Sequence, residues 1–114
     1  MAAKSVPVTT TVLYPNSDNA VFNKPYYMDS HLPLASEIWG SLGMTSWEVV
    51  TFSPGPDESR PQYVLATTVQ WTNDDAVKNA MNSERGKLVL EDIKNFTNIT
   101  PVVLSGQKAG QWQA

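Results

Sequence analysis

Residues 44–71, MTSWEVVTFSPGPDESRPQYVLATTVQW, decide the fold expected of this chain. Two segments, 44–53 and 62–71, are rich in β-branched and aromatic residues, which favours strands. Between them, SPGPDESRP at 53–61 holds the prolines, the glycine and the charged residues typical of a loop. The two strands therefore follow each other directly, and they are predicted to form a hairpin with no helix between them.

Working outward from this hairpin, the same elements recur on both sides. Further strands are predicted at 8–14 (VTTTVLY) and 99–105 (ITPVVLS). A helical pattern runs over 23–40, and another begins near Thr72, which with Asp75 resembles a capping box. The order β-α-β-β-α-β predicts an α+β, ferredoxin-like fold. In that fold a four-stranded antiparallel sheet carries two helices on one face.

Length and composition limit the number of domains and the kinds of site that the chain can hold. The 114 residues fit one domain, which we place at 8–106, with tails at 1–7 and 107–114. The absence of cysteine and the single histidine exclude thiolate chemistry and multi-histidine metal sites, so we expect no metal and no cofactor. A net charge of −3 with eight basic residues does not indicate the basic surface that binds nucleic acid. With no long apolar run, we expect a cytoplasmic protein without membrane contact.

Apolar residues fall on both faces of the predicted sheet. Strict alternation places Met44, Val50 and Phe52 on one face of their strand, and Trp47 and Val49 on the other. Two helices cover one face of a sheet, and the chain has no further segment for the second. We therefore predict a homodimer that packs through the open sheet face.

The helix at 23–40 contains a proline, which predicts an irregular turn. Pro33 cannot donate a hydrogen bond to the carbonyl of Asp29, and its ring crowds that carbonyl. A kink is expected near residues 30–32. Tyr27 and His31 lie one turn apart on one face of this helix, directly before the proline.

Three segments resemble a known family. Residues 22–34 (FNKPYYMDSHLPL) are similar to the F-D-x-x-Y-Y-x-x-x-H-x-P-L segment of the EthD family, named after ethyl tert-butyl ether degradation. Residues 92–97 (DIKNFT), followed by TP at 100–101, resemble its D-x-x-N-F-T…P segment, and LYP at 13–15 resembles the end of its first strand. Asn23 stands where aspartate is usual. The resemblance covers nearly the whole domain and implies a dimeric α+β barrel.

The resemblance implies an activity less specifically than it implies the fold. Related barrels include cofactor-free monooxygenases, polyketide cyclases, muconolactone isomerase-like enzymes and haem proteins. Some fungal relatives are described as dehydratases in aromatic polyketide pathways, which belong to secondary metabolism. We therefore expect a cofactor-independent dehydratase, cyclase or isomerase, a lyase-type enzyme acting on an apolar, aromatic or polyketide-like metabolite. The alternatives are a non-catalytic binding or accessory protein for a hydrophobic metabolite, and a monooxygenase of the same fold.

His31 is the predicted acid–base group, because it alone has an unperturbed pKa near neutrality. Tyr27 shares its helix face and is predicted to bond a substrate oxygen, while Asp92 would orient the imidazole. A second interpretation stays open. In it, His31 is a packed histidine bonded to the carbonyl near Asp29 that Pro33 frees, and Asp92 serves the turn.

Aromatic side chains are the predicted wall of the substrate pocket. Alternation places three of them on one face of the sheet, and the other three accompany the motifs above. The predicted substrate-binding residues are Tyr14, Tyr26, Trp47, Tyr63, Trp71 and Phe96. The alternative is that these side chains belong to the core or to the dimer interface.

Overall fold

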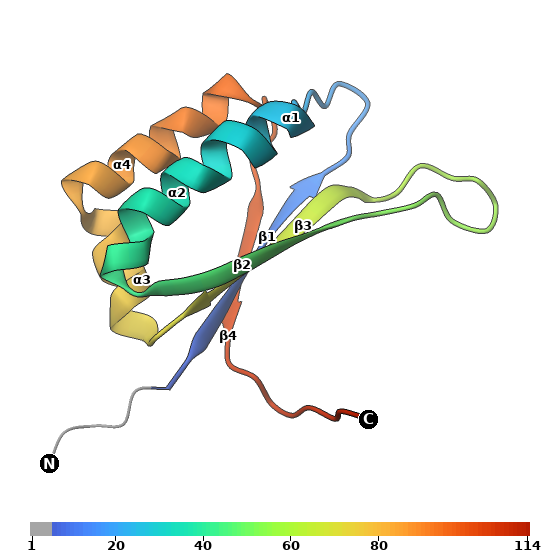
Figure 1. The fold of residues 1–114 in the computed structure, drawn as a ribbon. Helices are drawn as coiled ribbons and strands as arrows, with labels where there is room; N and C mark the ends of the chain where they lie inside the picture. Colours follow the sequence, from blue (N-terminus) through green and yellow to red (C-terminus); the bar gives the residue numbers. More distant parts are fainter. Residues whose placement is uncertain (1–5) are drawn as a thin grey trace, which may run out of the picture.

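A computed structural model describes residues 6–114 of the chain. The predicted tail at 1–7 therefore lies mostly outside the described residues. The fold is α+β and ferredoxin-like, as predicted: a four-stranded antiparallel sheet with its helices packed on one face (Figure 1). The strand order is β2-β3-β1-β4. The strands are β1 (Val8–Pro15), β2 (Met44–Thr51), β3 (Tyr63–Trp71) and β4 (Val102–Gly106).

The first helical segment, which we call the first helical layer, runs without interruption over residues 24–42, but its type of helix changes along the way. It comprises α1 (Lys24–Tyr26), the π-helical turn η1 (Tyr27–His31), α2 (Leu32–Trp39) and the 3-10 turn η2 (Gly40–Leu42). Asn23 caps its start by accepting a hydrogen bond from the Tyr26 backbone at 3.1 Å. The layer ends at Gly43, whose φ of 114° lies in the left-handed region that favours glycine.

The second helical layer consists of α3 (Asp74–Asn82), α4 (Glu84–Glu91) and the 3-10 turn η3 (Asp92–Asn95). The capping box predicted at Thr72 is wrong by one residue. Asn73 is the N-cap, and its side chain accepts from the Ala76 backbone at 2.8 Å. Ser83 separates the two helices and caps the second by accepting from Gly86 at 2.9 Å. The second helical layer is therefore interrupted at Ser83.

A bulge corrects one prediction about β2. The register pairs Met44 with Trp71 and Ser46 with Gln70, so Thr45 is an extra residue. The alternation reverses there, because the extra residue rotates the strand. Met44 consequently packs in the core beside Trp47 on the helix side, and not with Val50 on the open side. Strict alternation from the sequence could not foresee this reversal.

A second register shift affects Tyr63. Leu13 pairs with Ala66, but Pro15 pairs with Tyr63, so one strand holds an extra residue between these pairs. Directly paired residues share a face, and Pro15 and Leu13 fall on the side away from the helices. Tyr63 is therefore turned away from the helix side, where alternation alone had placed it.

The core lies between the sheet and the helices, and the other face of the sheet is open (Figure 1). One buried cluster surrounds Trp39 and Trp71, and a second surrounds Tyr14, Tyr27 and Phe96. The β2–β3 connection and the residues after β4 extend away from this body (Figure 1). Among residues 6–114, no helix has the length and apolar character needed to cross a membrane.

Candidate active site

The π-helical turn η1 places two conjugated rings side by side. The Leu32 backbone N–H donates to the Tyr27 carbonyl, five residues earlier, so the turn is wider than an α-helical one. Pro33 follows directly and has no N–H for a regular helical bond. Within this turn the rings of Tyr27 and His31 stack with centroids 5.5 Å apart and planes at 16°. Both residues are buried. The irregularity predicted near residues 30–32 is thus a π turn.

His31 is held by a carboxylate from the second helical layer. Its Nδ1 lies 3.0 Å from Oδ2 of Asp92, and the side chains are 8% and 11% exposed. A carboxylate accepts hydrogen bonds, so Nδ1 carries the proton in this pair. The other ring nitrogen, Nε2, is then the basic one. The interpretation in which His31 bonds the Asp29 carbonyl is not the arrangement found.

Asp92 is itself fixed by two further donors. Its Oδ1 accepts from the Tyr26 hydroxyl at 2.6 Å and from the Asn95 amide at 2.9 Å. Tyr26 belongs to α1, whereas Asn95 ends η3, one turn after Asp92. The carboxylate therefore ties the two helical layers together and presents its second oxygen to His31.

The protonation states follow from burial and hydrogen bonding. Burial lowers the pKa of His31 below its usual value, and the hydrogen bond and charge of Asp92 offset only part of this effect. Burial alone would raise the pKa of Asp92, but the bonds from Tyr26, Asn95 and His31 outweigh it and hold that pKa below normal. The pair is therefore a neutral imidazole beside an ionised carboxylate at neutral pH.

Phe96 supports the imidazole with a second aromatic contact. Its ring centroid lies 4.5 Å from that of His31 and 4.9 Å from that of Tyr27. Tyr26 stacks on Phe96 at 6.4 Å. These contacts fix the orientation of His31, since rotation of its ring would clash with its aromatic neighbours.

His31 lines a cavity between the sheet and the helices, with a volume of about 250 Å³. Its walls are mainly aromatic and aliphatic, with Trp39, Trp47 and Trp71 as the largest side chains. Val103 and Leu90 line the same space and are 59% and 40% exposed, so the cavity opens between β4 and the second helical layer. The volume lies below the ~300–1,000 Å³ usual for ligand pockets, which favours a small ligand.

A few polar groups lie among these apolar side chains. The Tyr27 hydroxyl lies 2.6 Å from Oγ1 of Thr67, and Trp71 Nε1 donates to Oγ1 of Thr10 at 3.0 Å. Trp47 Nε1 donates to the Ser36 hydroxyl at 2.8 Å. Thr67 was missed by sequence reasoning. The signal was present, because Thr67 is a polar residue on the inward face of β3 between Leu65 and Val69.

The predicted site residues divide into three groups. Tyr14, Tyr27, His31, Trp47 and Trp71 line the cavity. Asp92, Tyr26 and Phe96 lie behind His31 and contact its ring or its carboxylate partner, outside the cavity lining. Tyr63 lies on the far side of the register shift and does not line the cavity.

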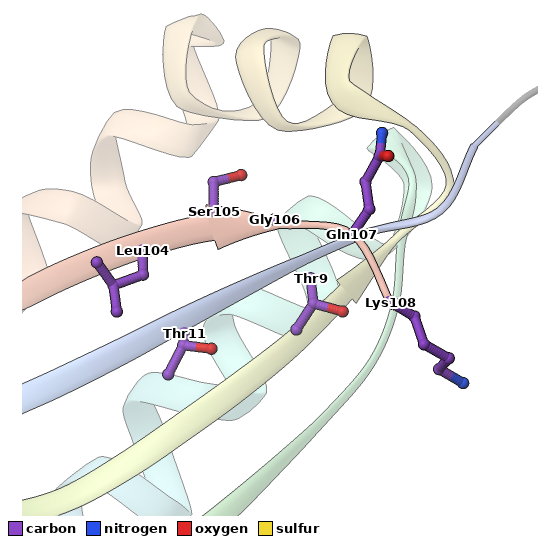
Figure 2. Close-up of a pocket in the computed structure, with 7 residues that line it drawn as sticks. All are labelled: Thr9, Thr11, Leu104, Ser105, Gly106, Gln107 and Lys108. Carbon is purple, nitrogen blue, oxygen red and sulfur yellow. The ribbon is translucent and has the colours of Figure 1, made fainter. Parts of the chain in front are cut away.

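A separate hollow lies at the end of β4, lined by Thr9, Thr11 and residues 104–108 (Figure 2). Figure 2 shows Leu104 and Ser105 pointing to opposite sides of the strand. None of the predicted catalytic residues lines this hollow, and it is more open than the cavity at His31. The acid–base candidates therefore belong to the cavity between the sheet and the helices.

Comparison with solved structures shows the fold. The chain is similar to an EthD-like protein from Ralstonia eutropha JMP134, with a TM-score of 0.83 and 22% identity over 96% of this chain and 97% of that one. The fold of this chain is thus that of EthD-like proteins. No family model matches the chain, and no curated protein is similar to it in sequence.

Enzymes of different kinds share this fold. The hydroxynitrile lyase of Passiflora edulis has a TM-score of 0.66 and 14% identity, over 96% of this chain and 99% of that one. A mutant form of SnoaB, a cofactor-independent oxygenase from Streptomyces nogalater, has a TM-score of 0.65 and 12% identity, over 92% and 95%. A ferredoxin-like protein from Bacteroides fragilis, at a TM-score of 0.59, is described as dimeric; it is 17% identical over 90% and 96% of the two chains.

Proposed function

We propose that this chain is a cofactor-independent enzyme of the lyase or isomerase type, in which His31 moves a proton on a small apolar metabolite. The observation that carries the proposal is the His31–Asp92 pair at the wall of an apolar cavity. A buried, neutral imidazole with its Nδ1 proton held by a carboxylate offers Nε2 as a general base. Perturbed, paired titratable groups beside a cavity are typical of catalytic sites.

The reaction would begin with proton abstraction from a carbon next to a carbonyl. Nε2 of His31 takes the proton, the C–H electron pair moves into the enolate, and Asp92 stabilises the imidazolium formed. In a dehydratase the imidazolium then returns a proton to the departing hydroxyl, which leaves as water. A hydroxynitrile lyase shares this fold, which supports a reaction of the lyase type. The aromatic walls favour a substrate with one or two flat rings.

Dehydration of a simple aldol tests this proposal. The probe is the aldol of benzaldehyde and acetone, which loses water to give benzylideneacetone, and the conjugated product is followed by its ultraviolet absorbance. We expect catalysis by the unaltered protein and loss of at least about a hundredfold in His31→Gln, the range typical of a general base. A carrier protein would bind the probe without converting it, and equal rates in the two proteins would contradict the role of His31.

We also propose that two copies of the chain pack through the open sheet face. The register places Val102, Leu13, Ala66 and Val50 in one row across all four strands. Val50 and Val102 are 50% and 39% exposed, and Leu104 on the same face is 55% exposed. A row that crosses the whole sheet can pack on its own copy about a two-fold axis. The dimer described for another protein of this fold supports the proposal.

A further inference from the structure

Three hydroxyl groups from different elements meet in the cavity beside His31. Tyr14 comes from β1, Tyr27 from η1 and Thr67 from β3, and each is at most 2% exposed. The Tyr27 and Thr67 oxygens lie 2.6 Å apart, and the ring of Tyr14 packs edge-on against that of Tyr27, with centroids 5.8 Å apart. All three residues line the cavity. We call these three residues the hydroxyl triad.

Counting protons in the hydroxyl triad leaves one donor over. The Tyr27 and Thr67 hydroxyls carry two protons, and the single bond between them uses one, whichever oxygen donates it. Burial is the main cause that raises the pKa of Tyr14 and of Tyr27, so both phenols stay protonated. With Tyr27 as the donor in this bond, the Thr67 proton is the one left over. Within residues 6–114, no protein acceptor is bonded to that last proton.

A buried donor without an acceptor is costly, so its presence needs a reason. The position supplies one, because the Tyr27 ring stacks directly on the His31 ring. A hydrogen-bond donor and a base therefore line the same small apolar cavity. Carbonyl chemistry requires this combination: the base removes a proton from carbon, while the donor stabilises the negative charge that forms on oxygen.

We propose that the hydroxyl triad, through Thr67, binds the carbonyl oxygen of the substrate and selects a ketone or similar carbonyl compound over a hydrocarbon of the same shape. The inference rests on the proposed function and adds the substrate class to it. As the C–H electron pair moves into the enolate, the charge on that oxygen grows and the Thr67 hydrogen bond strengthens. Thr67 then acts in substrate binding and in stabilisation of the transition state.

A matched pair of probes tests this assignment. The ketone 2-acetonaphthone and the alkene 2-isopropenylnaphthalene have nearly the same flat shape, but only the ketone carries an acceptor oxygen. Equilibrium dialysis gives the binding of each probe to the unaltered protein and to Thr67→Val, Thr67→Ser and Thr51→Val. Thr51→Val is the matched control, since Thr51 is exposed on the edge strand β2.

We expect the unaltered protein and Thr51→Val to bind the ketone about five- to tenfold more tightly than the alkene, as one net hydrogen bond allows. In Thr67→Val this ratio should fall to about one with little change in alkene binding, and Thr67→Ser should restore it. A ratio near one in the unaltered protein, a ratio that survives in Thr67→Val, or no binding of either probe would overturn the assignment.

The two proposals fail in different ways. His31→Gln should keep the ketone preference, because it leaves the hydroxyl triad intact, while losing the dehydration activity. A protein that prefers the ketone but converts no aldol would overturn the proposed catalysis and leave the carbonyl site standing. A protein that dehydrates the aldol without preferring the ketone would overturn the carbonyl site alone.

Discussion

The rings of Tyr27 and His31 lie nearly parallel, 5.5 Å apart, inside a single π-helical turn. The same turn thus presents a base and a hydroxyl to one cavity. Tyr27 is anchored to the sheet through Thr67, and His31 to the second helical layer through Asp92. The relative position of base and hydroxyl is therefore fixed by three separate parts of the fold. Measurable consequences follow from this arrangement.

Asp92→Asn should reduce dehydration of the aldol probe by at least about tenfold, because the imidazolium loses its countercharge and the tautomer of His31 is no longer fixed. The amide oxygen can still accept from Tyr26 and Asn95, so the fold should persist. Initial rates with the aldol probe measure the effect. Asp74→Asn is the control, since Asp74 pairs with Lys78 on the surface. Equal losses in both variants would contradict the role given to Asp92.

Stability should fall on the acid side, and His31 should account for part of the fall. Folding lowers the pKa of His31, so the unfolded chain binds a proton more readily than the folded one. The contribution of a neutral His31 is present above the unfolded pKa of about 6.5 and is lost as the pH falls through the lower folded pKa. Asp92, whose pKa is also lowered, acts in the same direction at still lower pH.

Thermal unfolding between pH 8 and pH 5 tests this linkage. We expect the unaltered protein to lose more stability over this range than His31→Gln, which has no imidazole to protonate. A parallel decline of both proteins would show that folding leaves the pKa of His31 unchanged.

Gly86→Ala should destabilise the fold by more than about 2 kcal/mol, since the added methyl group would overlap backbone and side-chain atoms. A Cβ at Gly86 would overlap the Ala80 carbonyl oxygen and lie 2.8 Å from Trp39 Nε1. At Gly40, by contrast, a Cβ meets nothing within 4 Å. Gly40→Ala should therefore stabilise by up to ~1 kcal/mol, because its helical backbone suits alanine. Denaturant unfolding of the two variants gives the comparison.

Val50→Glu should dissociate the proposed dimer, because it places a charge at the β2 end of the apolar row on the open sheet face. Sedimentation equilibrium should give about twice 12.6 kDa for the unaltered protein and about 12.6 kDa for the variant. Leu88→Glu is the matched control, since Leu88 is 51% exposed on α4, away from that face. A monomer in the unaltered protein would contradict the proposal.

The order of elements and the fold could be read from residue types alone. The two successive strands around the loop at 53–61 were enough to distinguish β-α-β-β-α-β from a parallel arrangement. Pro33 also predicted the irregular turn beside His31. These features are local, and local sequence determines them.

Register and long-range partners could not be read in this way. The reversed orientation of Met44 depends on a bulge that forms only when β2 pairs with β3. Tyr26 lies 66 residues before Asp92 in the chain, so its hydrogen bond to that carboxylate could not be read from a local pattern. Thr67 is a polar residue on an inward face, but its role in the cavity depends on Tyr27, forty residues away.

The transfer of a proton by His31 is the central claim, and isotope exchange observes it directly. In D₂O, the methyl protons next to the carbonyl of 2-acetonaphthone exchange when a base removes them, and proton NMR follows the loss of their signal. The account predicts exchange catalysed by the unaltered protein and by Thr51→Val, and no exchange above background with His31→Gln. Equal exchange with and without the imidazole, in folded protein, would contradict it.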